Sequence, residues 1–276
     1  MSLSTYLKRL TNYVFHGIPN NIVKVEVKSV VNGSTLTGRT ILITGGNKGI
    51  GLAIGERCVQ EGANVILIGR NEDDLKAASL KLGEHCSYIK YDLSNIEGLE
   101  KLLENAQQVY GEIDSLVCSA GISLHEKNIC DVSIENFEKQ FKTNLEGAYF
   151  LAQVFIKKNS DRDKNILFIS SERGFQCDDV PYGLTKVALN SLTKGLSRRF
   201  YKDGIRVNAI APGVTATAMT GKSSNDNMAN SGQVSKRWFV PEEIAEVALF
   251  LLSDASKCIS GEIIACDAGQ YISSYF

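Results

Sequence analysis

The feature that most constrains the fold is a regular alternation, from residue 40 onward, of short apolar runs with longer amphipathic segments. The short runs are mostly apolar throughout and end at Gly, Pro, Asn or Asp, as strands buried on both faces do. They cover residues 41–44, 64–69, 86–92, 115–121, 165–171, 205–212 and 262–267. Windows with helical spacing of apolar residues separate them, at 49–61, 72–82, 95–110, 133–158, 182–202 and 241–253. The sequence therefore predicts an α/β fold: a doubly wound parallel sheet of about seven strands with helices on both faces.

Two segments interrupt this alternation. We predict an N-terminal arm over residues 1–38, followed by a single domain over residues 39–276. The arm opens with an apolar stripe at helical spacing, and residues 22–28 (IVKVEVK) alternate like a half-buried strand. We expect the arm to pack on its own domain or on a second subunit, with a membrane-surface or partner helix as the alternative. Residues 218–239 are rich in Ser, Asn and Gly, which is typical of a lid or a disordered insert. The apolar stripe of the N-terminal arm consists of Leu3, Tyr6, Leu7, Leu10, Tyr13 and Val14.

Composition excludes several classes of protein. The 30 Lys and Arg against 31 Asp and Glu give a net charge of −1, so the chain is not a broadly basic nucleic-acid binder. No apolar run approaches the roughly 18 residues of a membrane span, and the first residues lack the features of a secretory signal. We therefore predict a cytoplasmic protein. The 7 cysteines form no CxxC pair and only 3 histidines are present, so we expect structural thiols and no metal site.

Residues 44–51 (TGGNKGIG) join the first predicted strand to the first predicted helix. Gly45 permits a sharp turn, Gly49 permits close approach of the backbone to a pyrophosphate, and Gly51 lets the helix lie close to the sheet. The N-terminus of the helix adds free N–H groups and the positive end of its dipole. Because the motif falls in the first strand–helix–strand unit, it predicts a Rossmann-type dinucleotide site.

The second predicted strand indicates which dinucleotide is bound. Chains that select NAD usually place a carboxylate at its tip, whereas here Gly69 and Arg70 stand there. Arg70 suits a 2′-phosphate and Lys48 adds a second cation, so we predict NADP(H), with NAD(H) the less favoured choice. The alternative is that both are solvated surface charges. Asp92 either accepts a hydrogen bond from the adenine amino group or caps a helix that starts near Ser94.

Tyr182 and Lys186 are predicted to lie four residues apart on one helix, which Pro181 begins. A phenol with a pKa near 10 is poorly matched to acid–base work at neutral pH, and a nearby ammonium lowers that pKa. A Tyr and a Lys four residues apart on a helix are common by chance, so the remaining motifs decide whether this pair is interpreted as catalytic.

Together these motifs resemble the short-chain dehydrogenase/reductase family, in its single-domain NADP(H)-dependent branch. The resemblance covers about residues 38–270 and is nearest to the 3-oxoacyl-carrier-protein reductases. It rests on TGGNKGIG (44–51), YDLS (91–94), SAG (119–121), Asn144, Ser171, YGLTK (182–186) and PGVTAT (212–217).

The resemblance implies a role for each catalytic residue. Tyr182 would donate or remove the substrate proton, and Ser171 would hold the carbonyl oxygen, with Ser170 as the rival serine. Lys186 would both lower the pKa of Tyr182 and hold the nicotinamide ribose. Asn144 would support a water that relays protons to Lys186, unless its amide merely bonds nearby backbone.

The resemblance also completes the expected dinucleotide site. Thr217 and the backbone around Val214 would hold the nicotinamide end. The full expected set is Gly45, Asn47, Lys48, Gly49, Ile50, Gly51, Arg70, Asp92, Leu93, Ala120, Gly121, Tyr182, Lys186, Pro212, Gly213, Val214 and Thr217.

Two motifs and one interval depart from the family pattern. Cys118 and Ser119 stand where two Asn residues are usual, and Ala268 stands where a Gly is usual. The interval from Ser171 to Tyr182 is 11 residues, about two shorter than usual. Because that loop would line the substrate cleft, we expect unusual specificity. The arm has no counterpart in the family core.

The predicted function is reduction of a ketone or other carbonyl by NADPH, or the reverse alcohol oxidation, with a 3-oxoacyl substrate as one form. The alternatives are a non-catalytic NADP(H)-binding regulator and, less favoured, a sugar-modifying enzyme. The predicted partners are a small-molecule substrate and further copies of the chain, since relatives pair the helices at 133–158 and 182–202 into dimers or tetramers. The apolar residues of the 218–239 segment form a lid, core contacts or an interface; they are Met219, Met228, Trp238 and Phe239.

Overall fold

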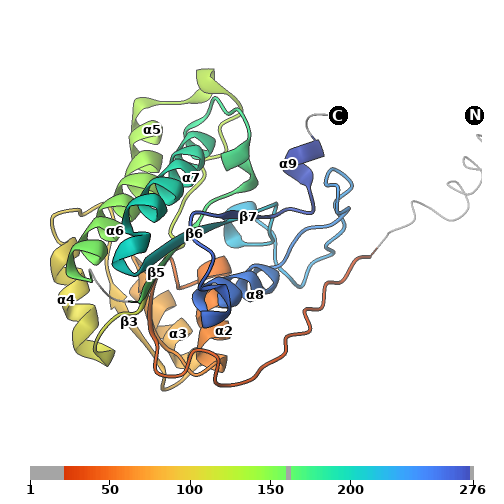
Figure 1. Cartoon of the computed structure of the whole chain (residues 1–276). Coiled ribbons are helices and arrows are strands. Elements are labelled where there is room, and N and C mark those ends of the chain that lie inside the picture. Colours follow the sequence, from red (N-terminus) through yellow and green to blue (C-terminus); the bar gives the residue numbers. More distant parts are fainter. Residues whose placement is uncertain (1–21, 160–162, 274–276) are drawn as a thin grey trace, which may run out of the picture.

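A computed structural model describes residues 22–159 and 163–273 (Figure 1). The seven strands are β1 (Thr40–Thr44), β2 (Asn64–Gly69), β3 (Cys86–Lys90), β4 (Ser115–Cys118), β5 (Lys164–Ile169), β6 (Ile205–Pro212) and β7 (Ile263–Cys266). The α-helices are α2 (Gly49–Gln60), α3 (Glu72–Leu82), α4 (Leu99–Tyr110), α5 (Ile134–Phe141), α6 (Gly147–Lys158), α7 (Pro181–Phe200), α8 (Pro241–Leu252) and α9 (Gln270–Ser273).

The strands form one parallel sheet in the order β3-β2-β1-β4-β5-β6-β7, which confirms the predicted doubly wound fold. The chain builds the sheet outward in one direction from β1 to β3 and then in the other from β4 to β7. In such sheets ligands bind outside the carboxyl ends of the strands, at the point where the order reverses. That point lies between β1 and β4.

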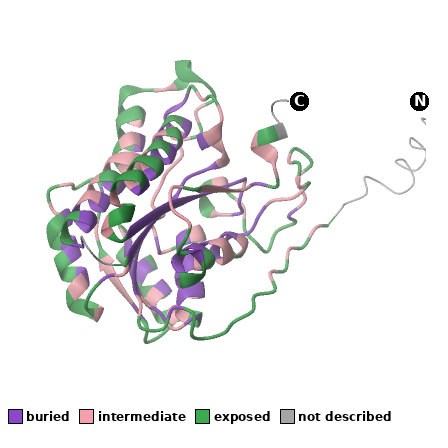
Figure 2. Cartoon of the chain, in the orientation of Figure 1, coloured by how far each residue is buried: buried purple, intermediate pink, exposed green. Residues whose placement is uncertain are grey.

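Helices cover both faces of the sheet (Figures 1 and 2). Successive side chains of a central strand pack into opposite cores. In β1, Leu42 packs with residues of α4 and α6, whereas Ile41 and Ile43 pack with residues of α2, α3 and α8. The central strands are buried along their whole length, which explains why their sequences are continuous apolar runs rather than alternating ones.

Two helical windows differ in detail from the prediction. The helix expected over 95–110 begins at Leu99, so Asp92 does not cap a helix near Ser94; that alternative is wrong. Instead Asp92 accepts a hydrogen bond from the Ser94 amide at 3.0 Å, within a turn. The window 133–158 is helical from Ile134 to Lys158, but a π-helical turn (η2, Lys142–Glu146) separates α5 from α6.

The described part of the arm runs in extended form along the outside of the domain before it enters β1 (Figure 1). Residues 22–28 alternate in exposure, as the sequence predicts, but they form no strand. Val23, Val25 and Val27 pack against a small cluster formed by Ala216, Met228 and Val240. The arm thus lies on its own domain; its predicted helical stripe falls outside the described residues.

A buried ion pair fastens the arm to α2. Arg57 donates to Glu61 at 2.7 Å and to the carbonyl of Val30 at 2.9 Å. The Glu61 carboxylate also accepts the amides of Asn32 and Thr35. Burial alone would raise the pKa of Glu61, but hydrogen bonds from Thr35 and Arg57 lower it to about 2.

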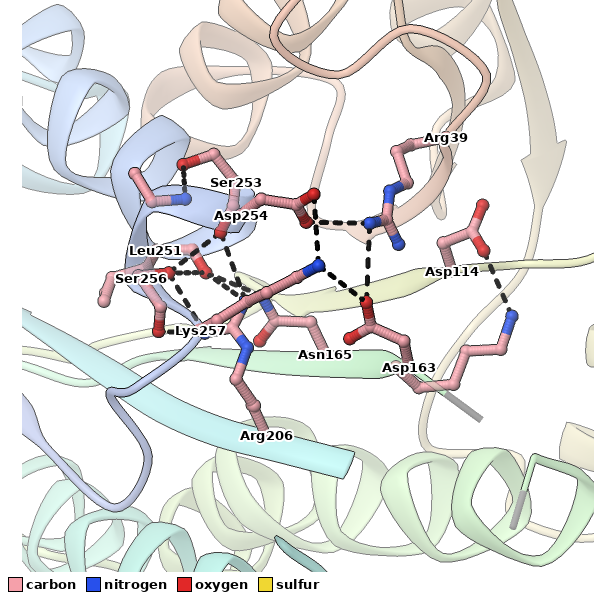
Figure 3. A network of polar contacts seen from close by, with 12 residues as sticks. Arg39, Asp114, Asp163, Asn165, Arg206, Leu251, Ser253, Asp254, Ser256 and Lys257 are labelled. Atoms are coloured by element: carbon pink, nitrogen blue, oxygen red, sulfur yellow. Dashed lines mark hydrogen bonds and ion pairs between the residues drawn. The ribbon is translucent and has the colours of Figure 1, made fainter. Parts of the chain in front are cut away.

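A second polar network ties helix ends to the amino edge of the sheet (Figure 3). Arg206, near the start of β6, donates to the carbonyls of Leu251 and Ser256 at 3.1 Å. Asn165 in β5 also donates to the Leu251 carbonyl, at 2.6 Å, and Arg39 pairs with Asp254 at 2.9 Å. These contacts fix the end of α8 beneath β5 and β6, at the edge of the sheet opposite the candidate site.

Candidate active site

The glycine loop after β1 adopts a backbone that only glycine takes easily. Gly45 and Gly49 have positive φ values of 66° and 56°. A Cβ on Gly45 would lie 2.8 Å from the Cα of Ala120, and a Cβ on Gly51 would lie 2.4 Å from the carbonyl oxygen of Gly45. The loop is therefore compact against the segment after β4. It leads into α2, whose first residues are Gly49 and Ile50.

Thr44 joins the ends of the two strands at the reversal point. Its hydroxyl oxygen accepts the amides of Ser119 and Ala120 at 3.2 and 3.3 Å. The backbone of the Ser119 position therefore stays anchored to β1 although Asn is absent there. Gly121 follows, and a Cβ on it would lie 3.5 Å from Asn144 Oδ1 and 3.6 Å from Lys186 Nζ. The SAG segment thus connects the glycine loop to two candidate catalytic side chains.

The residues expected to choose the dinucleotide lie where β2 meets the glycine loop. A Cβ on Gly69 would lie 3.1 Å from Asn47 Oδ1, so the end of β2 touches the loop. Arg70 and Lys48 are both exposed, and within the described residues neither forms an ion pair. Leu93 is buried against the first turn of α6.

Asn144 lies in the π-helical turn and is 1% exposed. Its side-chain amide pairs with the backbone of Ile122, accepting from the amide at 2.8 Å and donating to the carbonyl at 2.9 Å. It also donates to Thr185 Oγ1 at 3.3 Å, and Thr185 donates to the Tyr182 carbonyl. The hydrogen bonds to nearby backbone that we gave as the alternative role of Asn144 are thus present. They join the π-helical turn to the segment after β4, and the bond to Thr185 joins it to α7. π-turns of this kind are frequent at functional sites.

Tyr182 and Lys186 lie on one face of α7, as their spacing predicts. Pro181 is the first residue of the helix. The Nζ of Lys186 lies 5.5 Å from the centroid of the Tyr182 ring and donates to the Ile169 carbonyl, at the end of β5, at 2.8 Å. Lys186 is 4% exposed, and burial lowers its pKa to about 8.

The electrostatics of Tyr182 differ from the sequence-based expectation. Burial raises the pKa of its phenol, while a hydrogen bond with Ser171 and the charge of Arg173 act in the opposite direction. In this structure the ammonium of Lys186 therefore does not produce a net lowering of the tyrosine pKa. The physical reason is that removal from water disfavours the phenolate and the ammonium alike, with Lys186 buried and Tyr182 half-buried.

The two rival serines have different partners. The Ser170 hydroxyl donates to Asn190 Oδ1 at 2.6 Å and is buried beneath α7. Ser171 caps a short 3-10 helix (η3, Glu172–Phe175) and is hydrogen-bonded to Tyr182. Of the two serines, only Ser171 thus lies beside the phenol of Tyr182. This favours Ser171 over Ser170 as the residue that would hold the carbonyl oxygen.

The segment after β6 forms the other side of the site. Gly213 donates to the Cys266 carbonyl at the end of β7, and Val214 accepts the amide of Phe239. A Cβ on Gly49 would lie 3.3 Å from Cγ2 of Thr217, so this segment reaches the glycine loop. The glycine loop, expected at the pyrophosphate, and Thr217, expected at the nicotinamide end, thus lie next to each other.

The 218–239 segment is ordered by contacts with the rest of the chain. Met228 is fully buried and Phe239 nearly so, whereas Met219 is exposed. Met228 donates its amide to the Val23 carbonyl of the arm and packs with Trp238. Two of the four apolar residues are therefore core contacts rather than parts of an open lid.

Two residues near the site escaped the sequence reasoning. Thr185 bridges Asn144 and α7, and only its place inside the YGLTK motif points to it. Glu172 follows Ser171 directly; the signal was a pair of charged residues, Glu172 and Arg173, between a buried strand and a helix.

Comparison with known proteins identifies the family. A family model described as "Enoyl-(Acyl carrier protein) reductase" matches residues 45–270. A 3-oxoacyl-[acyl-carrier-protein] reductase of Chlamydia trachomatis is 34% identical over 245 residues, covering 85% of this chain and 98% of the relative. The chain therefore belongs to the short-chain dehydrogenase/reductase family of oxidoreductases, whose members use NAD(P)(H).

Other relatives and solved structures agree on the family. An uncharacterized oxidoreductase of Staphylococcus aureus strain N315 is 29% identical, covering 83% of this chain and 97% of the relative. A crystal structure from Brucella melitensis, titled a short-chain dehydrogenase/reductase of the glucose/ribitol dehydrogenase type, has a TM-score of 0.78 at 32% identity. It covers 86% of this chain and 98% of that one. A dehydrogenase/reductase from Sinorhizobium meliloti has a TM-score of 0.78 at 26% identity, covering 87% and 97%.

The part of the chain that the structure describes holds neither a candidate membrane span nor a candidate metal site. No helix among those residues has the length and apolarity of a membrane span. Nor do three or more His, Cys, Asp or Glu side chains gather there in a way that suits a metal ion.

Proposed function

We propose that this protein is an NADPH-dependent carbonyl reductase that converts a ketone to an alcohol, or catalyses the reverse oxidation. The observation that carries the proposal is the meeting of Tyr182, Ser171 and Lys186 at the carboxyl end of β5. A proton donor, a hydrogen-bond donor for the carbonyl oxygen and a cation are the groups that carbonyl reduction requires beside a hydride source.

The glycine loop fits a dinucleotide. The positive φ values of Gly45 and Gly49 and the tight contacts around Gly51 leave backbone amides at the N-terminus of α2, where a pyrophosphate binds well. Ala120 contacts this loop at Gly45 and Thr217 contacts it at Gly49. Together with Asn47 of the loop, Gly121 and the segment from Pro212 to Val214, they would hold the rest of the molecule. When bound, the reduced dinucleotide supplies the hydride.

Arg70 and Lys48 support NADPH as the choice. Lys48 belongs to the glycine loop and Arg70 follows Gly69, which touches that loop, and in the described structure neither is engaged in an ion pair. A planar guanidinium pairs well with a phosphate, whereas the ribose hydroxyls of NADH offer no negative charge. Asp92, whose carboxylate bonds the Ser94 amide, remains our proposal for the adenine contact.

The side chains of the site have complementary tasks. Tyr182 donates its phenolic proton to the carbonyl oxygen as negative charge develops there, and Ser171 donates a hydrogen bond to the same oxygen. Lys186 holds the nicotinamide ribose, and its charge stabilises the phenolate left on Tyr182. Asn144 fixes the π-helical turn next to Lys186, the place from which a water would return the proton.

The nature of the ketone is a separate question. The relative from Chlamydia trachomatis is named for a 3-oxoacyl carrier-protein substrate, whereas the structure from Brucella melitensis is titled for glucose or ribitol. We propose a small-molecule ketone, with 3-oxoacyl thioesters among the first compounds to test.

The test is turnover of NADPH with a panel of ketones, followed by the nicotinamide absorbance. Tyr182→Phe removes the proton donor, so we expect kcat to fall by about a hundredfold to ten-thousandfold while the Kd for NADPH stays nearly unchanged. Tight NADPH binding without turnover of any ketone by the wild type would instead favour a regulatory dinucleotide-binding protein. Undiminished turnover by Tyr182→Phe would remove Tyr182 from its role.

We further propose that a second copy of the chain docks on α5 and α7. Their outer faces expose apolar side chains, among them Ile134, Phe137 and Leu184. These three residues line an apolar hollow together with Ile129, Val132 and Pro181. The cytoplasm is the compartment we propose, which agrees with the free thiols of all 7 cysteines.

A further inference from the structure

Three backbone segments meet around the place that we propose for the dinucleotide. They are the glycine loop (44–51), the segment after β4 (119–126) and the segment after β6 (213–221). The glycine loop contacts both of the others. A Cβ on Gly45 would lie 2.8 Å from the Cα of Ala120. A Cβ on Gly49 would lie 3.3 Å from Cγ2 of Thr217. Each of the two later segments is thus held against the loop near its beginning.

A hydrogen bond of His125 joins the same two segments further along the chain. Its ring nitrogen Nε2 lies 3.0 Å from the carbonyl oxygen of Met219. Because a carbonyl oxygen only accepts, Nε2 carries the hydrogen and donates it. β4 and β6 lie on either side of β5 in the sheet, so this bond crosses the region in front of the carboxyl end of β5, where Ser171 lies. The three contacts therefore close a ring of chain around the proposed dinucleotide site.

The segment after β4 is anchored on both sides of His125. Asn144 binds the amide and the carbonyl of Ile122 at 2.8 and 2.9 Å. Gln140, which is fully buried in α5, donates to Glu126 Oε1 at 2.8 Å. Between these anchors His125 has a φ of 59°, in the left-handed region that residues other than glycine seldom adopt. Such a conformation persists where its surroundings fix it, and it is common at functional sites.

The acceptor of the bond lies in a turn that is itself well fixed. Met219 is the middle residue of a 3-10 helix (η5, Ala218–Thr220). The hydroxyl oxygen of Thr220 accepts the amide of Thr217 at 3.1 Å, within the same turn. His125 and Met219 are both exposed, whereas the residues at the other two contacts of the ring are half-buried. The bond between His125 and Met219 can therefore open to water while each segment keeps its own structure.

We propose that the hydrogen bond from His125 to Met219 is a gate, which opens each time the dinucleotide enters or leaves the site. The two groups bind each other rather than the dinucleotide. Loss of the bond should therefore change how fast the ring opens, and not how tightly the dinucleotide is held. The inference rests on the proposed dinucleotide site and adds a residue that controls the rate of exchange there.

The experiment measures the exchange of NADPH in a stopped-flow instrument, through the fluorescence of the nicotinamide. Mixing the protein with NADPH gives the association rate constant. Mixing the loaded protein with a large excess of NADP+ gives the dissociation rate constant. His125→Ala removes the donor, whereas His125→Gln keeps a side-chain N–H. Both variants carry a Cβ at the same backbone position, so the strain of a positive φ is common to them.

His85→Ala is the matched control. The ring of His85 is also exposed and also has a hydrogen bond of 3.0 Å, between its Nδ1 and Asn64 Oδ1. It directly precedes β3, at the edge of the sheet opposite the candidate site.

In His125→Ala we expect both rate constants to rise by about threefold to tenfold, as the loss of one hydrogen bond predicts. Their ratio, the Kd for NADPH, should change by less than about twofold, since both rates rise together. His125→Gln should exchange NADPH at nearly the rate of the wild type. His85→Ala should leave both rate constants unchanged.

The possible failures are distinguishable. Unchanged rate constants in His125→Ala would refute the gate and leave the dinucleotide site standing. A faster dissociation alone, with a weaker Kd, would also refute the gate, because His125 would then hold the dinucleotide or support its site. A wild type that does not bind NADPH would refute the proposed function itself, and the inference would fall with it.

Discussion

Lys186 shows how a buried side chain of the candidate active site affects the stability of the fold. Its ammonium is buried and donates to one carbonyl, that of Ile169, and burial lowers its pKa to about 8. Between that value and the ordinary lysine pKa of 10.5, the folded protein binds fewer protons than the unfolded chain. The buried charge therefore destabilises the fold below about pH 8, and the effect is relieved as the pH rises toward 10.5.

Replacing Lys186 by Met should remove this pH dependence. Between about pH 7.5 and about pH 9.5, the free energy of unfolding of the wild type should rise relative to that of Lys186→Met by about 2 kcal/mol. Urea unfolding of both proteins at the two pH values measures the difference. Parallel changes in the two proteins would mean that Lys186 keeps an ordinary pKa.

Arg70 provides a test of cofactor choice at the level of one side chain. Arg70→Ala should weaken NADPH binding by about tenfold to a hundredfold, because it removes a charge-assisted hydrogen bond, while the Kd for NADH changes little. Fluorescence titration with each dinucleotide gives the two constants. Equal losses for NADPH and NADH would contradict the assignment.

The limit of sequence reasoning is visible at individual residues. Motif spacing selected Ser171 over Ser170, and the structure places only Ser171 beside Tyr182. The direction of the net pKa shift of Tyr182 was not predictable, because it depends on how deeply the phenol is buried, and spacing along a helix carries no information on depth. The unpaired oxygen of Glu172 is likewise a property of its surroundings.

At the scale of the elements, strands were easier to predict than the segments between them. Short runs that end at Gly, Pro, Asn or Asp located all seven strands. The central ones are mostly apolar, because a strand covered by helices on both faces has no polar side, whereas the edge strand β3 contains Ser87 and Lys90. The π-turn at Asn144 was not visible, since it changes the hydrogen-bonding pattern without changing the apolar spacing around it. Residues 22–28 alternate in exposure like a strand, yet they form none. Their alternation comes from Val23, Val25 and Val27, which pack against the side chains of the 216–240 segment.

The attachment of the arm to α2 should depend on the Glu61 carboxylate. Glu61 is fully buried and bridges Arg57 to the amides of Asn32 and Thr35. Glu61→Gln should therefore lower the free energy of unfolding by about 3 kcal/mol. Glu56→Gln, which breaks the solvent-exposed pair with Lys81, should cost less than about 1 kcal/mol. Urea unfolding near neutral pH measures both.

The ion pair of Glu61 with Arg57 should also make the stability of the fold decrease in acid. Because the folded pKa of Glu61 is lowered from 4.5 to about 2, its contribution is present in full above about pH 4.5 and is lost as the pH falls toward 2. The difference in stability between wild type and Glu61→Gln should shrink over that range. A constant difference would show that the carboxylate is not the source of the effect.

At the scale of the whole molecule, the outer faces of α5 and α7 should hold a second copy of the chain. Phe137→Asp places a charge in the middle of this apolar surface, so the protein should run at the monomer mass of 30.2 kDa instead of at a multiple of it. Light scattering during gel filtration measures the mass. Leu80→Asp, at a position 73% exposed on α3, is the control and should leave the assembly intact. A wild type that is already monomeric would refute this interface.

The position of the arm has a consequence for how this protein is compared with others. The family match begins at residue 45, whereas the valines that support Met228 and the 216–240 segment lie before it. Alignments confined to the shared region therefore cover the candidate active site but omit the arm residues that pack against the 216–240 segment. Two chains that agree at every aligned position can still differ in how the 216–240 segment is held, if one of them lacks these arm residues.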